Sequence, residues 1–522
     1  MIKSRIMAVI GILLVVLQAV VSCMVLYRVV NFDILPGRYV AVLVLLLMLA
    51  IILVIVMQFF NLIHYVGKAL AVIMSALLIF VFVAVGKAEK TLDEGFKAGD
   101  TMQISMEVLA LKTDYSVDIT GMGSGIFGIT NDEASYEHDK KTIELIEKDL
   151  GYSVTVKEYP DNFTLAKALL TGEIDSMIIN SAYTSTLDEA FETLVEGDEG
   201  YLGIDADNQR ISFASKVSTV ATYTITVKAE SSSGLGVGST DRTPINTSVT
   251  PFIIYISGID VKGGISTVSR SDVNVIVCVN PVTKQILMVT TPRDSYVEIP
   301  GKTDNSSKRD KLTHAGSYGT GCEYSIATLE NVYGIDIDYY LKVNFTSVVE
   351  IVDLLGGISV YSDQDFVGRH GNYQFYKGYN EMNGEQVLSF ARERFTLQGG
   401  DYSRGRNHTE IIKAVLNKAM SPAILANYSQ LLELAADNIE TNMTTDEITE
   451  IVKMQLDDGA SWNFVSYATE GINDGQQELR YCWSYSGSGL YVTILDEESV
   501  AHASDLMARV LNGEILDQTA IQ

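Results

Sequence analysis

Three long apolar runs at the start of the chain constrain its fold more than any other feature. They cover residues 6–30, 39–66 and 69–86 and contain almost no charged side chains. Each run is near or above the ~20 residues that an α-helix needs to span the hydrocarbon core of a bilayer. A single run of this kind is also compatible with a buried core helix. Three of them in succession predict a three-helix membrane anchor over residues 1–88.

The first apolar run does not have the pattern of a secretory signal. It is too long, it has no small-residue cleavage site, and two further runs follow it. Lys3 and Arg5 flank this run, which favours a cytoplasmic N-terminus. Three spans then place the chain from residue 87 onward outside the cell, as expected of a multi-pass protein of the cell membrane. Arg28 and Arg38 oppose this orientation, because the first loop would also lie outside.

Charge and cysteine content exclude several classes of protein. The chain has 38 basic and 65 acidic residues, and only six of the basic and one of the acidic residues lie in residues 1–88. The remainder therefore carries a net charge of −32, which excludes nucleic acid as an expected partner. Cysteine spacing supports neither a zinc site nor a disulfide framework. Cys322 and Cys482 can in principle pair, but free buried thiols are expected.

Beyond the anchor, the residue pattern predicts two α/β domains. A small accessory α/β domain is expected over residues 103–230, with a helix at 182–194. A Ser/Gly/Thr-rich linker follows, and a larger α/β domain with a mixed central sheet flanked by helices is expected over 250–515. Within the larger domain, strands are expected at 252–258, 272–280 and 285–291, and a long amphipathic helix is expected at 406–420.

Arginine is scarce, and its distribution points to one region. Of the twelve arginines after residue 88, eight lie between residues 270 and 406. Arg309 and Arg369 are explained as surface charges. A guanidinium group can bind two phosphate oxygens, and aspartates are suitable ligands for Mg²⁺. Arginines interleaved with aspartates at strand ends therefore suggest a site for a phosphorylated ligand and a divalent metal. The clusters are Arg270 with Asp272, Arg293 with Asp294, and Arg392, Arg394, Asp401, Arg404 and Arg406.

Several segments resemble the LytR–CpsA–Psr (LCP) family, and they occur in the order that the family has. The likeness covers about 250–515, with a motif core at 256–415. It implies a membrane-anchored protein of the capsule-associated type, which carries an accessory domain. The segments are 272–300 with Thr-Pro-Arg-Asp-Ser-Tyr, 310–316 with Asp-Lys-Leu-Thr-His-Ala-Gly, 392–395 with Arg-Glu-Arg-Phe, and 399–407 with Gly-Gly-Asp-Tyr-Ser-Arg-Gly-Arg-Asn.

The resemblance implies an extracellular phosphotransferase of Gram-positive bacteria that builds the cell wall. Such enzymes move an anionic glycopolymer, teichoic acid or capsular polysaccharide, from a polyprenyl-pyrophosphate carrier to a peptidoglycan hydroxyl. Matched positions imply Mg²⁺ (or Mn²⁺) on Asp260 and Asp272, and Asp272 would also orient or deprotonate the hydroxyl. Many members have Gln after the last arginine, where this chain has Asn407 and His408. The implied pyrophosphate-binding residues are Arg270, Arg293, Arg392, Arg394, Arg404 and Arg406, and the implied catalytic residues are Asp272, Arg293, Arg392 and Arg394.

Two other functions stay open on the sequence alone. A pyrophosphatase acting on the lipid-linked polymer would use the same geometry, with water in place of the sugar hydroxyl. A non-catalytic membrane sensor or regulator of cell-envelope synthesis would bind the same lipid, and the anchor and the accessory domain suit it. Acyl transfer is not supported, because the pattern shows no Ser–His–Asp or Cys–His arrangement.

Overall fold

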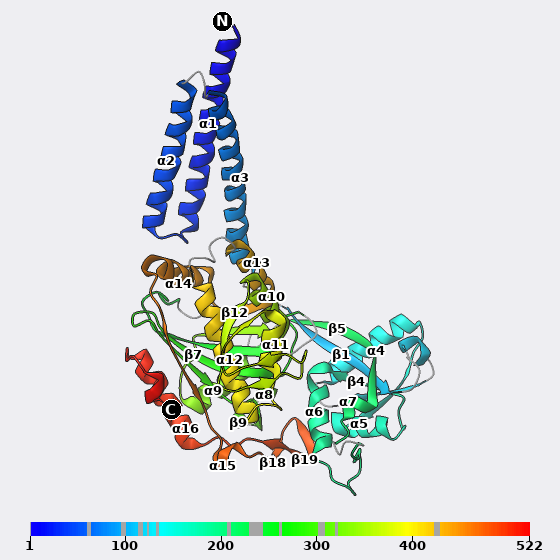
Figure 1. Cartoon of the computed structure of the whole chain (residues 1–522). Coiled ribbons are helices and arrows are strands. Elements are labelled where there is room, and N and C mark those ends of the chain that lie inside the picture. Colours follow the sequence, from blue (N-terminus) through cyan, green and yellow to red (C-terminus); the bar gives the residue numbers. More distant parts are fainter. Residues whose placement is uncertain are drawn as a thin grey trace.

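The chain folds into a helical anchor, a small α/β domain and a larger α/β domain (Figure 1). The α/β class expected from the sequence is therefore confirmed. The computed structural model describes residues 2–59, 64–95, 101–112, 118–122, 125–131, 135–205, 210–228, 244–259, 264–300, 308–318, 322–421 and 428–521.

The anchor consists of α1 (Ile2–Phe32), α2 (Gly37–Phe59) and α3 (His64–Gly95). Each of these helices contains a segment that is long and apolar enough to cross a membrane. Most of each segment is exposed at the surface of the protein, which suits a helix surrounded by lipid. The second run was expected to extend to residue 66, but α2 ends at Phe59. Apolar composition limits where a span can lie and does not mark where the chain turns.

Ion pairs join the anchor to the larger α/β domain. Arg38 at the start of α2 donates to the Leu456 carbonyl oxygen at 2.6 Å and pairs with Asp457 at 3.4 Å, both in α14 (Thr445–Asp458). Arg28 pairs with Glu89 of α3 at 3.2 Å. Arg28 and Arg38, which argue against a cytoplasmic N-terminus, therefore both have acidic partners. The first loop lies at the same end of the anchor as the large domain, opposite the N-terminus (Figure 1).

The accessory domain is a five-stranded sheet with the strand order β3-β2-β4-β1-β5. Strand β2 is parallel to β3 and β4, and β1 is antiparallel to β4 and β5. Helix α6 (Ser181–Glu192) starts directly after β4, where the Asn180 side chain accepts from the Ala182 N–H and caps the helix. The other elements are β1 (Thr101–Leu111), η1 (Ile119–Met122), β2 (Ile126–Thr130), α4 (Tyr136–Leu150), β3 (Thr155–Tyr159), α5 (Asn162–Leu170), β4 (Ser176–Asn180), α7 (Phe213–Lys216) and β5 (Val217–Lys228).

The larger domain is built on a mixed six-stranded sheet with the order β16-β11-β6-β7-β8-β17. Central strands β6, β7 and β8 are antiparallel, and the flanking strands β11 and β17 run parallel to β6 and β8. Strands β7 and β8 are almost fully buried, because helices cover both faces of the sheet. Cys322 and Cys482 are buried, and all four cysteines are free, as expected.

The elements of this domain alternate along the chain. Its strands are β6 (Phe252–Ile259), β7 (Ser271–Asn280), β8 (Gln285–Thr290), β9 (Tyr296–Ile299), β10 (Lys308–Lys311), β11 (Tyr339–Asn344), β12 (Ile358–Ser362), β13 (Phe366–Val367), β14 (Gln374–Phe375), β15 (Gly378–Met382), β16 (Ile439–Thr441), β17 (Asn463–Ala468), β18 (Glu478–Cys482) and β19 (Tyr485–Val492). Its helices, besides α14, are α8 (Leu312–Ala315), α9 (Glu323–Tyr333), α10 (Phe345–Leu354), α11 (Gly384–Arg392), α12 (Gly400–Ala419), α13 (Tyr428–Asn438), α15 (Ile472–Gly475), α16 (Glu497–Leu511) and η3 (Gln518–Ala520).

The two α/β domains contact each other on both sides of the segment that leads to Arg270. Gln103 of β1 forms backbone hydrogen bonds with Ser266 and Val268, at 3.1 and 3.0 Å. Helix α6 packs against the β18–β19 hairpin, where Ala190 joins a buried cluster with Tyr485. The accessory domain therefore helps to fix the position of the chain just before β7.

Candidate active site

Antiparallel pairing of β7 and β8 places two charged residues side by side. Asp272 lies at the start of β7, and Arg293 follows the end of β8. Arg293 Nη1 lies 2.8 Å from Asp272 Oδ1, and the Thr313 hydroxyl donates to the same oxygen at 2.9 Å. Burial opposes ionisation of Asp272, but Arg293, Arg270 and Arg404 outweigh it and lower the pKa of its carboxyl group. Asp272 is therefore a carboxylate at neutral pH.

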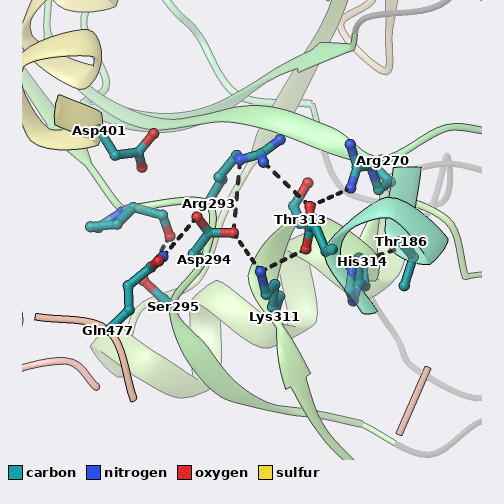
Figure 2. A network of polar contacts seen from close by, with 12 residues as sticks. Thr186, Arg270, Arg293, Asp294, Ser295, Lys311, Thr313, His314, Asp401 and Gln477 are labelled. Carbon is teal, nitrogen blue, oxygen red and sulfur yellow. Dashed lines mark hydrogen bonds and ion pairs between the residues drawn. The ribbon is translucent and has the colours of Figure 1, made fainter. Parts of the chain in front are cut away.

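Asp294 is a buried carboxylate at the centre of the site (Figure 2). Lys311 Nζ lies 3.1 Å from Asp294 Oδ1, and Gln477 Nε2 donates to Oδ2 at 3.1 Å. Arg394 Nη2 lies 3.9 Å from the same Oδ2. Burial opposes ionisation, but Lys311, Arg293 and Arg394 outweigh it and lower the pKa of Asp294. Asp294 thus joins the three motif segments that the sequence places far apart.

The accessory domain contributes a third carboxylate, Glu189 of α6. Its Oε2 lies 2.7 Å from Lys311 Nζ, and its Oε1 lies 3.0 Å from Arg270 Nη1 and 3.4 Å from Arg293 Nη2. Burial opposes its ionisation, but Lys311 and Arg270 outweigh it and lower the pKa of Glu189 to about 2. Sequence reasoning missed this residue, because one glutamate on a helix of an acidic domain carries no motif.

The expected arginines divide into two groups. Arg404 pairs with Asp401 and is close enough to Arg293 and Asp272 for their charges to act on it. Arg392 is exposed with its guanidinium carbon 5.2 Å from the centre of the Phe345 ring, and the exposed Arg406 pairs with Asp363 at 3.1 Å. The structure therefore gathers Arg270, Arg293, Arg394 and Arg404 around Asp272 and Asp294.

Helix geometry explains part of this division. The amphipathic helix was expected to begin at residue 406, but α12 begins at Gly400, with Asp401 in its first turn, where the helix dipole favours an acidic side chain. The first turns of α12 contain two glycines and several polar residues, so they lack the apolar periodicity that predicts a helix. Since each helical residue turns by about 100°, Arg404 and Arg406 point to different sides of α12.

Glu393 organises the segment that carries Arg392 and Arg394. Its Oε1 accepts the N–H groups of Arg394, Phe395 and Thr396 at 2.9–3.0 Å, and its Oε2 accepts that of Arg369 at 2.7 Å. The side chain is buried, so these four backbone donors replace water as its partners. Glu393 thereby fixes the turn that aims Arg394 at Asp294.

Asn407 and His408, which follow the last arginine of the motif, connect α12 to the end of α11. Asn407 Nδ2 donates to the Phe390 carbonyl oxygen at 3.2 Å, and His408 Nε2 lies 2.9 Å from the Ala391 carbonyl oxygen. Burial, together with Arg404, lowers the pKa of His408 to about 3, so the ring is neutral and Nε2 is its donor. Both side chains hold the backbone next to Arg392.

A pocket opens between β7, the end of β8 and α12. Its charged lining consists of Asp272, Arg293, Asp401 and Arg404, and its enclosed space is small, with room for about one or two water molecules. The apolar and aromatic lining residues are Val273, Val275, Pro292 and Tyr402.

One of the two expected metal ligands can be placed. Asp260 lies outside the described residues, whereas Asp272 is an ionised carboxylate that lines the pocket. In the part of the chain that the structure describes, no group of three or more His, Cys, Asp or Glu side chains is arranged to hold a metal. Mg²⁺ commonly binds through one or two carboxylates together with phosphate oxygens and water. The Asp272 carboxylate is therefore suited to be one ligand of such a site.

The chain is similar in sequence to known bacterial transferases. The TagU proteins of Bacillus licheniformis and Enterococcus faecalis, both named polyisoprenyl-teichoic acid–peptidoglycan teichoic acid transferase, are 33% and 34% identical over 201 and 202 residues. These matches cover 38% of this chain and 63% and 64% of the relatives, so the chain spans just under two thirds of their length.

Solved structures are also similar to about half of this chain. The crystal structure of Bacillus subtilis TagV has 26% sequence identity and a TM-score of 0.41 and covers 51% of this chain and 99% of TagV. A structure of TagT bound to LIIa-WTA has 24% identity and a TM-score of 0.42 and covers 53% of this chain and 96% of TagT.

The profile of the LytR_cpsA_psr family matches residues 215–487, which is just over half of the chain. This range contains every motif segment that resembled the family in the sequence and all three arginine clusters. The chain therefore belongs to the LytR–CpsA–Psr family.

Proposed function

We propose that this protein is a membrane-anchored phosphotransferase that moves an anionic glycopolymer from a polyprenyl-pyrophosphate carrier to a peptidoglycan hydroxyl. The observation that carries the proposal is the convergence of Arg270, Arg293, Arg394 and Arg404 on the carboxylates of Asp272 and Asp294. Guanidinium groups suit phosphate oxygens, and the printed names of the TagU relatives describe transfer of a polymer from a polyisoprenyl carrier to peptidoglycan.

In the proposed reaction, the arginines neutralise the diphosphate and hold it in line for attack. The acceptor hydroxyl attacks the phosphorus that carries the glycan, and its proton passes to water. The bond from this phosphorus to the bridging oxygen breaks, and that oxygen stays on the polyprenyl phosphate. Polyprenyl phosphate leaves, and guanidinium groups stabilise the charge that builds up on the transferred and leaving oxygens. Because its pKa is lowered, Asp272 is a weak base, so its main part is to hold and orient groups.

We also propose a divalent metal in this site. Asp272, with Asp260 as the second ligand implied by the family resemblance, would hold Mg²⁺ or Mn²⁺, which supplies additional positive charge to phosphate oxygens. The carboxylate of Asp272 is kept ionised by Arg293 and Thr313, so it needs no deprotonation before a metal binds.

The lipid and the membrane set the location of the reaction. The three apolar helices would hold the large domain at the membrane that contains the lipid carrier. Lys3 and Arg5 favour a cytoplasmic N-terminus, and the large domain lies at the opposite end of the anchor (Figure 1). These observations support an extracellular catalytic domain.

The test uses the full-length protein in detergent micelles with a lipid-linked glycopolymer, peptidoglycan oligomers and Mg²⁺. A covalent polymer–glycan product supports the proposal. Release of free polymer would identify a pyrophosphatase, and binding of the lipid without turnover would identify a sensor. Either of these two results would replace the proposed function.

A further inference from the structure

Glu189 brings a negative charge from the accessory domain to the basic side chains of the site. Its carboxylate oxygens contact Lys311, Arg270 and Arg293 at 2.7, 3.0 and 3.4 Å. The Glu189 side chain is 19% exposed, and the three basic side chains are between 4% and 13% exposed. These ion pairs are therefore largely shielded from solvent. Charges attract each other much more strongly in such surroundings than at the protein surface.

Docking of α6 fixes where this carboxylate lies. Thr186, Glu189 and Ala190 share one face of the helix, because residues three and four apart are neighbours on a helix surface. Thr186 Oγ1 lies 3.3 Å from His314 Nε2, and Ala190 is buried against the β18–β19 hairpin. Asp188, on another side of α6, instead accepts the Ala214 N–H within the accessory domain. Glu189 therefore lies on the face of α6 that packs against the large domain, and its carboxylate points to Arg270 and Lys311.

The partners of Glu189 are the groups that a diphosphate needs. Arg270 and Arg293 belong to the proposed diphosphate site, and a guanidinium binds carboxylate and phosphate oxygens with the same two-pronged geometry. A diphosphate oxygen cannot take the position of Glu189 on these side chains while the carboxylate stays there. Two anions at such a distance also repel each other, and Asp272 and Asp294 already supply nearby negative charge.

We propose that Glu189 is an internal competitor for the diphosphate, so that a lipid diphosphate binds by displacing this side chain from Arg270, Arg293 and Lys311. The inference rests on the proposed function and adds regulation to it. Displacement also removes three ion pairs between α6 and the large domain, so that binding of the ligand loosens the accessory domain.

The experiment compares Glu189→Gln with Glu144→Gln in the full-length protein in detergent micelles. Glu144 is exposed on α4 of the same domain, so it is a matched control. The probes are inorganic pyrophosphate and farnesyl diphosphate, titrated by calorimetry. We expect Glu189→Gln to bind both probes about tenfold more tightly, because one buried negative charge at ion-pair distance is removed. Glu144→Gln should bind like the wild type.

Two further measurements follow displacement directly. Without ligand, Glu189→Gln should melt at a lower temperature than the wild type, since three buried basic groups lose a counter-charge, and pyrophosphate should raise its Tm by more than that of the wild type. In the wild type, amide exchange in α6 should speed up when pyrophosphate binds, while exchange in α4 stays constant.

The outcomes separate this inference from the proposed function. Equal or weaker probe binding by a folded Glu189→Gln variant overturns the competition, and weaker binding assigns Glu189 the role of positioning the arginines. If this variant does not fold, Glu189→Asp, which withdraws the carboxylate by one methylene, should show a smaller gain in affinity. If neither wild type nor variant binds a diphosphate, the proposed function fails together with the inference. If the wild type binds and Arg293→Ala does not, while Glu189→Gln equals the wild type, only the inference fails.

Discussion

The ammonium group of Lys311 lies 3.1 Å from the carboxylate of Asp294, and both side chains are buried. The β9–β10 hairpin creates this contact, since its register pairs Lys311 with Tyr296, two residues after Asp294. Burial alone would make Lys311 lose its proton more easily, but Asp294 and Glu189 raise the pKa of its ammonium group. The hairpin thus joins two family motifs through a charged pair that stays ionised.

Lys311→Met should destabilise the fold strongly. Removing one partner leaves the other charge buried without compensation, at a cost of about 3–5 kcal/mol. Chemical denaturation of the full-length protein in detergent measures the change, and Lys377→Met, at an exposed position, should change stability by less than about 0.5 kcal/mol. The double variant with Asp294→Asn and Lys311→Met should lose less free energy of unfolding than the sum of the losses in the two single variants. Simple additivity would show that the pair is not coupled.

Arg293→Ala should remove most of the transfer activity. The guanidinium contacts Asp272, lies near Asp294 and Glu189, and is placed to neutralise a diphosphate, so its loss should lower the transfer rate by about 100- to 1,000-fold. Arg309→Ala is the matched control, because Arg309 is 56% exposed and its guanidinium contacts Glu298 and the Tyr296 ring, away from Asp272 and Asp294. Near-normal transfer by a folded Arg293→Ala protein would exclude the arginine from the mechanism.

His408 should make stability depend on pH. Its pKa falls from 6.5 in the unfolded chain to about 3 in the fold, so the unfolded state binds more protons between these values. The contribution of neutral His408 to the free energy of unfolding is complete above pH 6.5. It is lost as the pH falls, and the loss reaches about 2 kcal/mol at pH 5. His408→Gln, which keeps a donor for the Ala391 carbonyl oxygen, should be less sensitive to pH between 6.5 and 5.

His502→Gln provides the comparison for this titration. His502 is exposed on α16 beside the Tyr467 ring. Unfolding curves of the two variants at several pH values should show the reduced slope for His408→Gln only. The same slope in both variants would mean that His408 does not titrate as its burial requires.

Thiol labelling of intact cells should place the large domain outside. Val282→Cys lies in the β7–β8 turn at a position that is 67% exposed, so a membrane-impermeant maleimide should react with it. Ser4→Cys should react only after the cells are permeabilised. The wild-type protein gives the background, since Cys278, Cys322 and Cys482 are buried. Labelling of Ser4→Cys in intact cells with none at Val282→Cys would reverse the topology.

Residue patterns were enough to predict the local elements and the family. Apolar runs predicted strands at 272–280 and 285–291, and the structure has β7 and β8 at Ser271–Asn280 and Gln285–Thr290. The helix expected at 182–194 is α6, from Ser181 to Glu192. These predictions succeed because hydrophobic periodicity is a property of neighbouring residues, and every sheet or helix must bury its apolar side.

Which charged residues meet depends on how the elements pack in the fold. No residue pattern separates Arg394 from Arg392 or Arg404 from Arg406, but Glu393 and the turn of α12 do so. The sequence also could not place Glu189 beside Arg270, since these residues are 81 positions apart and come together only when α6 docks. Charge pairing between domains depends on the position of whole elements, which a local pattern does not encode.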